Sequence, residues 1–272
     1  METKIHSSSG LLKINVKELW DYRELFYIFA WRDLKVRYKQ TLLGVIWVLF
    51  QPLAATVIFS IFFGKLAKIP SGDLPYSLFV LCGLVFWNFF SGSLSHASNS
   101  LTENESIIKK VYFPKLILPI SSIVTGIIDF SINFLLLVGY TLLLGIIPSW
   151  TFIPVVLLGI LITSISASGL GLFLSSVNVK YRDVRYILPF FIQILMFVSP
   201  VIYPTAIVRT SNKFLLALNP ITAVIETVRS TISPSGVFDW PLIIVSSISA
   251  IAIFVFGLTF FRYTEKYLAD IV

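Results

Sequence analysis

The stretch Leu42–Phe63 reads LLGVIWVLFQPLAATVIFSIFF and contains no Asp, Glu, Lys or Arg. An α-helix of this length, at about 1.5 Å per residue, crosses the roughly 30 Å hydrocarbon core of a bilayer. The segment RDLKVRYK at Arg32–Lys39 lies directly before it and is strongly basic. Because Lys and Arg gather on the cytoplasmic side of membrane proteins, this order predicts a first span that begins in the cytoplasm.

The composition places the whole chain in a membrane. The chain is 56% hydrophobic and 13% charged, with a mean hydropathy of +0.87, which excludes an ordinary soluble domain. The net charge of +7 is explained by topology, so we expect no nucleic-acid partner. The single cysteine, Cys82, lies in an apolar run and is expected to pack there, and the two histidines, His6 and His96, stand alone. We therefore expect no metal site, and we predict no cleaved signal peptide.

Five further apolar runs predict an all-α integral membrane protein with six transmembrane helices. The predicted spans are 42–63, 76–94, 116–146, 151–177, 184–203 and 241–261. With residues 1–41 in the cytoplasm, sixteen of the 21 Lys and Arg residues fall on the cytoplasmic side, and so does the tail 262–272. Splitting 116–146 into two short helices would invert everything downstream, which the charge bias disfavours.

Residues 18–39 predict an N-terminal cytoplasmic amphipathic helix. A polar stripe at steps of three and four residues is flanked by aromatic side chains that favour the headgroup region, so we expect the helix to lie along the membrane surface. The stripe consists of Asp21, Glu24, Arg32, Lys35 and Lys39. Arg23 and Arg37 fall outside it, which indicates a kink or a side that faces protein.

A short cytoplasmic helix is predicted between the second and third spans. Thr102 and Glu105 match a capping box, and Pro114 ends the helix. Its capping and charged residues are Thr102, Glu103, Glu105, Lys109 and Lys110. This segment is either an ordinary solvated helix or a docking surface for a partner.

On the external side, residues 204–240 predict a helix too short to cross the membrane. Asn219 is a candidate N-cap, Pro220 occupies the first helical position, and the helix ends near Pro234. Such a segment is expected to be re-entrant or interfacial and buried against protein. Glu226 and Arg229, three residues apart, are expected to pair with each other.

Four of the polar side chains inside predicted spans are candidates for a functional role. Asp129 and Asn133 share one face of the third span, either as interhelical hydrogen-bond partners or as part of a substrate or gating site. Gln51 lies beside a proline in the first span, and Gln193 lies between two prolines in the fifth. Prolines bend helices, so these two spans are the best candidates to line an opening.

The sequence carries no motif for catalysis on its own. No segment matches the phosphate loop GxxxxGK(S/T), and no nucleophile and base suggest a catalytic triad. We therefore expect a transport subunit without enzymatic activity, with ATP hydrolysis on a separate subunit. This expectation concerns the energy source and does not identify the substrate.

Four motifs in order resemble one family. They are RDLKVRYKQTLLGVIWVLFQP (32–52), KKVYFPK (109–115), NVKYRDV (178–184) and NPITAVIETVR (219–229). The chain resembles, from about Glu18 to Ala269, the membrane subunit of polysaccharide-export ABC transporters, closest to O-antigen exporters and similar to teichoic-acid exporters.

The resemblance implies a homodimer in the bacterial inner membrane, contacted by two ATP-binding subunits that hold the ATP and Mg. The implied substrate is a polysaccharide on a polyprenyl pyrophosphate carrier. The resemblance also implies that residues 18–39 form a gate helix, 102–112 a coupling helix and 204–234 an external gate region.

Two further hypotheses concern the substrate path. Basic residues at the cytoplasmic rim, namely Arg32, Lys35, Arg37 and Lys39, would attract the pyrophosphate. Aromatic side chains would carry sugars through a channel or, in the alternative interpretation, meet lipid. The candidates are Trp47, Phe50, Phe59, Phe86, Trp87, Phe190 and Phe197. Competing functions are a drug or small-lipid exporter, an ion-coupled carrier using Asp129, and a membrane-embedded transferase.

Overall fold

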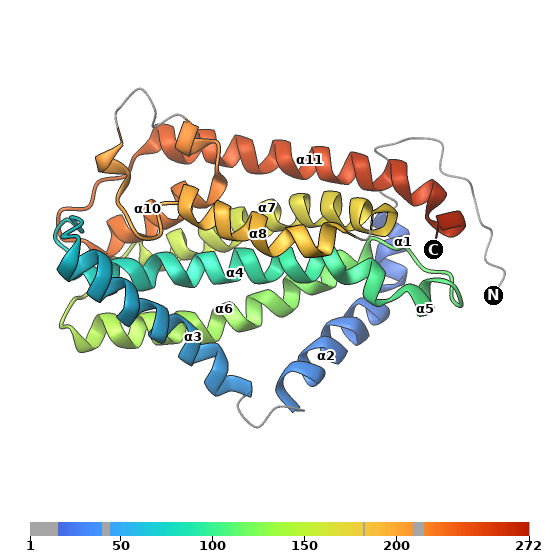
Figure 1. Cartoon of the computed structure of the whole chain (residues 1–272), viewed down its shortest axis with the longest axis horizontal. Coiled ribbons are helices and arrows are strands. Elements are labelled where there is room, and N and C mark those ends of the chain that lie inside the picture. Colours follow the sequence, from blue (N-terminus) through green and yellow to red (C-terminus); the bar gives the residue numbers. More distant parts are fainter. Residues whose placement is uncertain (1–15, 40–43, 182, 209–214, 272) are drawn as a thin grey trace.

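The computed structural model describes residues 16–39, 44–181, 183–208 and 215–271, which form helices without any strand. The helices form an elongated bundle (Figure 1). Their bounds are α1 Val16–Asp21, α2 Arg23–Lys39, α3 Gly44–Phe59, η1 Ser60–Leu66, α4 Tyr76–Glu103, α5 Glu105–Ile108, α6 Ile117–Leu143, α7 Phe152–Lys180, α8 Val184–Val198, η2 Thr205–Ile207, α10 Pro220–Ile232 and α11 Trp240–Ile271.

Five helices are long and apolar enough to cross a membrane. They are Ile46–Leu66, Tyr76–Glu103, Ile117–Leu143, Phe152–Lys180 and Trp240–Lys266. The predicted third span is one unbroken helix, α6, so the alternative that splits it is wrong. The protein is thus a multi-pass membrane protein.

The predicted fifth span is shorter than expected. Helix α8 has 15 residues and ends at Val198, because Ser199 adopts an extended backbone and Pro200 follows it. At about 1.5 Å per residue such a helix falls short of the roughly 30 Å hydrocarbon core. The sixth crossing therefore stays a prediction.

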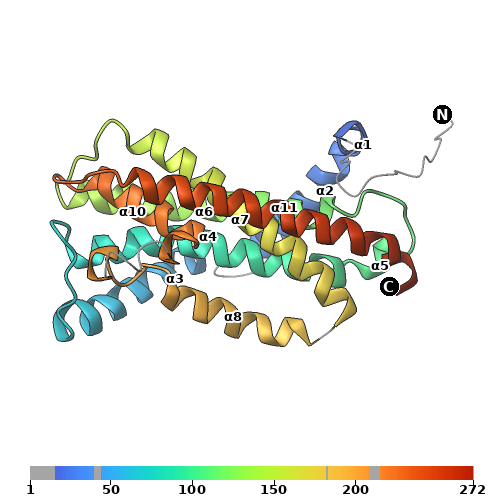
Figure 2. The ribbon, with the colours of Figure 1, turned by 90° about the horizontal axis from the view of Figure 1, so that it is seen from above.

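The arrangement in space agrees with alternating crossings. Helices α1 and α5, the start of α8 and the end of α11 lie at one end of the bundle (Figures 1 and 2). Helix α10 and the connection between α6 and α7 lie at the other end. Apart from α2, whose C-terminal turn reaches the middle of the bundle, the segments predicted to be cytoplasmic thus lie toward one end (Figure 1).

Helix α4 is the centre of the bundle. It packs against α6, α7, α3 and α10, and most of its side chains are buried. It continues through Glu103, nine residues beyond the predicted end of the second span at Leu94. Asn178 of α7 stabilises this polar extension, because its side-chain amide donates to the Ser98 carbonyl oxygen at 3.1 Å and to Asn99 Oδ1 at 3.1 Å.

Helices α7 and α11 approach each other closely at two glycines. A Cβ on Gly257 would lie 1.9 Å from the Gly169 carbonyl oxygen, and one on Gly169 would lie 2.6 Å from the Cα of Phe254. Small residues allow the backbones of membrane helices to come this close. The contact fixes α11 along the length of α7.

Candidate functional site

A cavity of about 420 Å³ with charged and hydroxyl side chains on its wall lies between α2, α4 and α6, at the end of the bundle that carries α5. A volume of this size is in the range of small-ligand sites, roughly 300–1,000 Å³. The cavity is lined by Arg32, Asp33, Val36, Arg37, His96, Ser100, Glu103, Asn104, Leu118, Ser121, Ser122 and Thr125.

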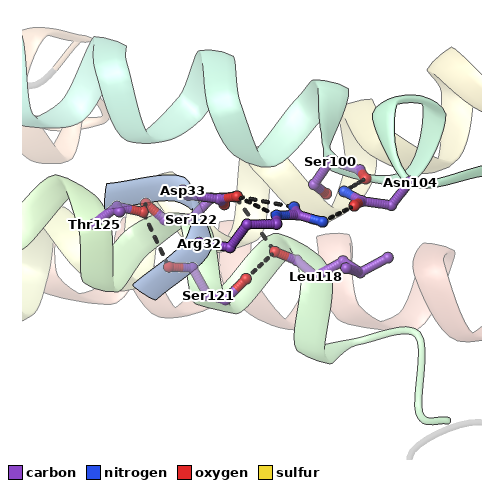
Figure 3. Close-up of polar contacts among 8 residues, drawn as sticks. All are labelled: Arg32, Asp33, Ser100, Asn104, Leu118, Ser121, Ser122 and Thr125. Carbon is purple, nitrogen blue, oxygen red and sulfur yellow. Dashed lines mark hydrogen bonds and ion pairs between the residues drawn. The ribbon is translucent and has the colours of Figure 1, made fainter. Parts of the chain in front are cut away.

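Arg32 connects α2 to Asn104, the residue between α4 and α5, across this cavity (Figure 3). Its Nη1 donates to Asn104 Oδ1 at 2.7 Å, and its Nε and Nη2 donate to Asp33 Oδ1 at 3.1 and 2.8 Å. Asn104 is oriented in turn by its Nδ2, which donates to the Ser100 carbonyl oxygen at 2.7 Å. The guanidinium is thus held by a carboxylate and an amide in a fixed position on the cavity wall.

A second polar cluster lies deeper, at the C-terminal turn of α2. Arg37 and Tyr38 both donate to the carboxylate of Asp129, which lies near the middle of α6, and Arg37 also contacts Nε2 of His96. Burial lowers the pKa of Arg37, although Tyr38 and Asp33 oppose this change, and burial raises the pKa of Tyr38, which Arg37 opposes. The geometry places an ion pair and a phenol donor on one carboxylate.

This contact refines the prediction for residues 18–39. The chain forms two helices, α1 and α2, with the break at Tyr22 beside Arg23, and Arg37 faces protein, as its place outside the polar stripe indicated. Helix α2 reaches Asp129 with its C-terminal turn. It is therefore not confined to the end of the bundle but extends to its middle. The surface placement of the helix stays a prediction.

Four hydroxyl groups line the cavity from α4 and α6. Ser121 and Ser122 each donate to the Leu118 carbonyl oxygen, at 2.8 and 3.3 Å, and Ser100 donates to that of Ala97 at 2.7 Å. The Thr125 hydroxyl lies 3.0 Å from the Ser122 carbonyl oxygen. Each hydroxyl hydrogen is thus bound within its own helix, which leaves the oxygen lone pairs as acceptors.

Of the four predicted rim cations, the structure brings two into the cavity. Arg32 and Arg37 line it, whereas Lys35 and Lys39 are exposed on α2 and are not part of its wall. Asp33, His96 and Asn104 belong to the site and were not predicted. Asp33 follows Arg32 directly within the basic motif, but no signal in the sequence joins α2 to residues some 60–70 positions away.

The predicted coupling helix is shorter and begins later. Thr102 is not a cap, because it lies in the last turn of α4 and donates to the Asn99 carbonyl oxygen at 2.8 Å. Helix α5 comprises only Glu105–Ile108, and Lys109 follows it and donates to Glu105 at 2.8 Å. The capping-box prediction is therefore wrong, while Lys109 and Lys110 are exposed, as a docking surface requires.

The predicted channel aromatics divide into three groups. Phe86 and Trp87 are buried inside the core of the chain, which argues against a channel-lining role for them. Phe59 is partly buried and packs against the same core. The remaining four are exposed on α3 and α8, namely Trp47, Phe50, Phe190 and Phe197.

The other predicted polar residues within spans are not part of the cavity. Gln51 on α3 and Gln193 on α8 are exposed. Asn133 is buried on α6, and its Oδ1 has no hydrogen-bond partner among the described residues. Asn133 therefore does not share the contacts of Asp129.

At the opposite end of the bundle, the helix predicted after Asn219 is confirmed as α10, while its placement outside the membrane stays a prediction. The Asn219 side chain caps it by accepting from the Ile221 amide, and Pro220 is its first residue. Arg229 donates to Glu226 Oε1 at 3.0 Å, which confirms the predicted pair.

Arg229 also makes contacts that the sequence did not indicate. It donates to the carbonyl oxygens of Phe79, Pro200 and Val201 at 2.7–3.1 Å. Its guanidinium stacks 3.4 Å from the centroid of the Phe79 ring. The buried arginine thus joins α10 to α4 and to the turn after α8, far from the cavity.

Comparisons with known proteins identify the family. The model of the ABC-2 type transporter family matches residues 24–233. The chain is 26% identical to the O-antigen export system permease protein RfbA of Myxococcus xanthus, with 94% of this chain and 98% of the relative covered. A protein of the same name from Klebsiella pneumoniae is 25% identical, over 96% of this chain and 98% of that protein. The polysialic acid transport protein KpsM of Escherichia coli is 22% identical, over 86% and 91%. The chain therefore belongs to the ABC-2 type transporter family of membrane proteins.

Proposed function

We propose that this protein is the membrane subunit of an exporter that moves a lipid-linked polysaccharide, carried on polyprenyl pyrophosphate, out across the bacterial inner membrane. One observation carries the proposal: nearly the whole chain is similar to permeases of O-antigen export from two genera. The similarity to a polysialic acid transport protein supports the broader class of polysaccharide substrates.

The energy for this transport would come from ATP bound with Mg on a partner subunit. Membership of the ABC-2 family supports such a partner, and the sequence of this chain has no phosphate loop. We propose a homodimer contacted by two ATP-binding subunits, with the exposed segment around α5 as the docking surface. Closure of the ATP-binding subunits would then move the membrane subunits as rigid bodies.

The cluster around α2 suggests how such a movement reaches the substrate side. Helix α2 and the segment after α5 pack on one apolar cluster, in which the rings of Phe29 and Phe113 lie 5.6 Å apart. Tyr112 also donates to Glu18 of α1 at 3.3 Å. A displacement of α5 would therefore be transmitted to α2, the proposed gate helix.

Deletion of the gene in its native host tests this function. We expect cells that lack the glycan on their surface and retain lipid-linked glycan on the cytoplasmic side. The wild-type gene should restore both to normal. The measurement is the amount of glycan in spheroplasts that is protected from an externally added glycosidase. Unchanged surface glycan, together with intracellular retention of a small amphiphile, would instead support a drug or small-lipid exporter.

Purification tests the partner. We expect an ATP-binding protein to co-purify with this chain at equal stoichiometry in mild detergent. Transport driven by an ion gradient in vesicles without ATP would support a carrier that uses Asp129 and would contradict the proposal.

A further inference from the structure

We infer that the cavity between α2, α4 and α6 binds a neutral sugar unit of the exported glycan rather than the phosphate groups of its lipid carrier. The inference rests on the proposed function and adds to it a binding site within one subunit. It follows from the balance of hydrogen-bond donors, acceptors and charges on the cavity wall.

The cavity wall is partly apolar, and the polar groups on it are mainly acceptors. The hydroxyl groups of Ser100, Ser121, Ser122 and Thr125 each donate to carbonyl oxygens of their own helices, so they present lone pairs. The carboxylates of Asp33 and Glu103 line the same cavity and accept hydrogen bonds without donating any. A ligand that fills the cavity must therefore supply donors.

The donors on the wall are fewer and largely engaged. Three N–H groups of Arg32 bond to Asp33 and Asn104, which leaves two of its five for a ligand. Arg37 is engaged with Asp129 and His96 at the deep end. The cavity thus offers a cation at one point on a wall of acceptors.

The charges on the wall balance. The lining holds two cations, Arg32 and Arg37, and two carboxylates, Asp33 and Glu103. Asp129, the ion-pair partner of Arg37, adds a carboxylate just beyond the lining, so the site has no net positive charge when His96 is neutral. A phosphate or pyrophosphate carries acceptor oxygens alone and would lie against two carboxylates, which is unfavourable. The pyrophosphate hypothesis for Arg32 and Arg37 is therefore disfavoured at this cavity.

Sugar hydroxyls match this wall because each both donates and accepts. They can donate to the serine, threonine and carboxylate oxygens, and they can accept from the remaining N–H groups of Arg32. The cavity volume of about 420 Å³ accommodates a ligand of this class. The cavity lies at the end of the bundle that carries α5, and the glycan would enter at this end.

A binding measurement tests the inference directly. The probe is the oligosaccharide that mild acid releases from the host's own lipid-linked glycan. The release frees it of lipid and phosphate, and it is then tritiated at its reducing end. It is dialysed to equilibrium against the purified transporter in lipid nanodiscs. We expect saturable binding that excess inorganic pyrophosphate does not displace.

The variant Ser121→Ala/Ser122→Ala removes two acceptors and keeps helix-forming side chains. We expect about tenfold weaker binding, since two hydrogen bonds to the ligand are lost. The matched control is Ser131→Ala on the same helix, where the hydroxyl donates to the Ile127 carbonyl oxygen at 2.8 Å and is not part of the cavity wall. This control is expected to bind as the wild type does.

Glu103→Gln provides a second variant at an exposed position, where folding is not at risk. We expect it also to weaken binding of the oligosaccharide. Equal binding by the wild type and both variants, displacement by pyrophosphate, or no saturable binding by the wild type would each overturn the inference. The proposed function is judged separately, because glycan retention in the deletion strain does not depend on this cavity.

Discussion

The guanidinium of Arg37, on α2, forms an ion pair with the carboxylate of Asp129, 92 residues later on α6. The two side chains are 26% and 21% exposed, so most of each is removed from solvent. Tyr38 donates to the same carboxylate. The C-terminal turn of α2 is thus fixed to the middle of a long apolar helix by a shared acid.

Asp129→Asn should destabilise the protein. The substitution leaves Arg37 largely buried without its counter-ion, and after a discount for partial exposure we expect a loss of about 1–2 kcal/mol. Each kcal/mol of lost stability lowers the melting temperature by about 2–4 °C. The measurement is thermal unfolding in detergent.

The double variant Arg37→Ala/Asp129→Ala should lose less stability than the two single variants lose together, because the two side chains interact. Lys109→Ala, in the exposed Glu105–Lys109 pair, is the control, with a change of about 0.5 kcal/mol or less. Strict additivity at Arg37 and Asp129 would show that the pair contributes nothing.

Gly257→Ala should prevent the close packing of α7 and α11. The new Cβ would lie 1.9 Å from the Gly169 carbonyl oxygen, a distance that forces the two backbones apart. We expect loss of most folded protein, measured as the monodisperse fraction in fluorescence-detected size-exclusion chromatography. Gly139→Ala on α6 is the matched control, since a Cβ at that position would meet no atom within 4 Å and alanine favours a helix by about 1 kcal/mol. Equal yields for both variants would contradict the packing argument.

Arg229→Met should loosen the packing around Cys82. The substitution removes hydrogen bonds to the carbonyl oxygens of Phe79, Pro200 and Val201. The last two lie outside any helix and would be left without this donor, at a cost of about 1–3 kcal/mol each. Cys82 is the single cysteine of the chain and is fully buried beside Gly83, whose Cβ would meet Arg229 Nη2 at 2.9 Å. We therefore expect faster maleimide labelling of the variant, measured by mass spectrometry.

Glu226→Gln is the control for this experiment, because it keeps the bonds from Arg229 to the backbone. It should label at close to the wild-type rate. Slow labelling of Arg229→Met would mean that the arginine does not hold this region closed.

Replacing both Lys109 and Lys110 by Glu should uncouple ATP hydrolysis from export. The surface around α5 would change sign, while the fold should persist because exposed ion pairs contribute about 1 kcal/mol or less. The measurement is the number of ATP molecules hydrolysed per glycan exported in vesicles. Wild-type coupling in the variant would exclude a docking role for these lysines.

The hydrophobic runs predicted the long helices well, because burial in lipid demands continuous apolar sequence. Helix α10 was also predictable, since the cap at Asn219 and the proline at Pro220 are local signals. The end of α4 was not predictable. Its polar residues look like a loop until Asn178, some 80 positions later, supplies hydrogen bonds to them.

The candidate site was predicted only in part, and for a similar reason. Arg32 and Arg37 were identified from their local charge, but their partners lie far away in the sequence, Asn104 just after α4 and Asp129 on α6. The hydroxyl groups of α6 carry no periodic signal that separates them from ordinary helix-packing serines. Pairing across helices depends on the packing, which a single sequence does not specify.

The end of α11 lies at the same end of the bundle as α1 and α5. An affinity tag or fluorescent protein fused after α11 would therefore occupy the space that we assign to the ATP-binding subunits. Such a fusion would separate the membrane subunits from the ATP-binding subunits during purification. The result would look like that of an uncoupled mutant. An epitope inserted in the connection between α6 and α7, at the opposite end, avoids that interference.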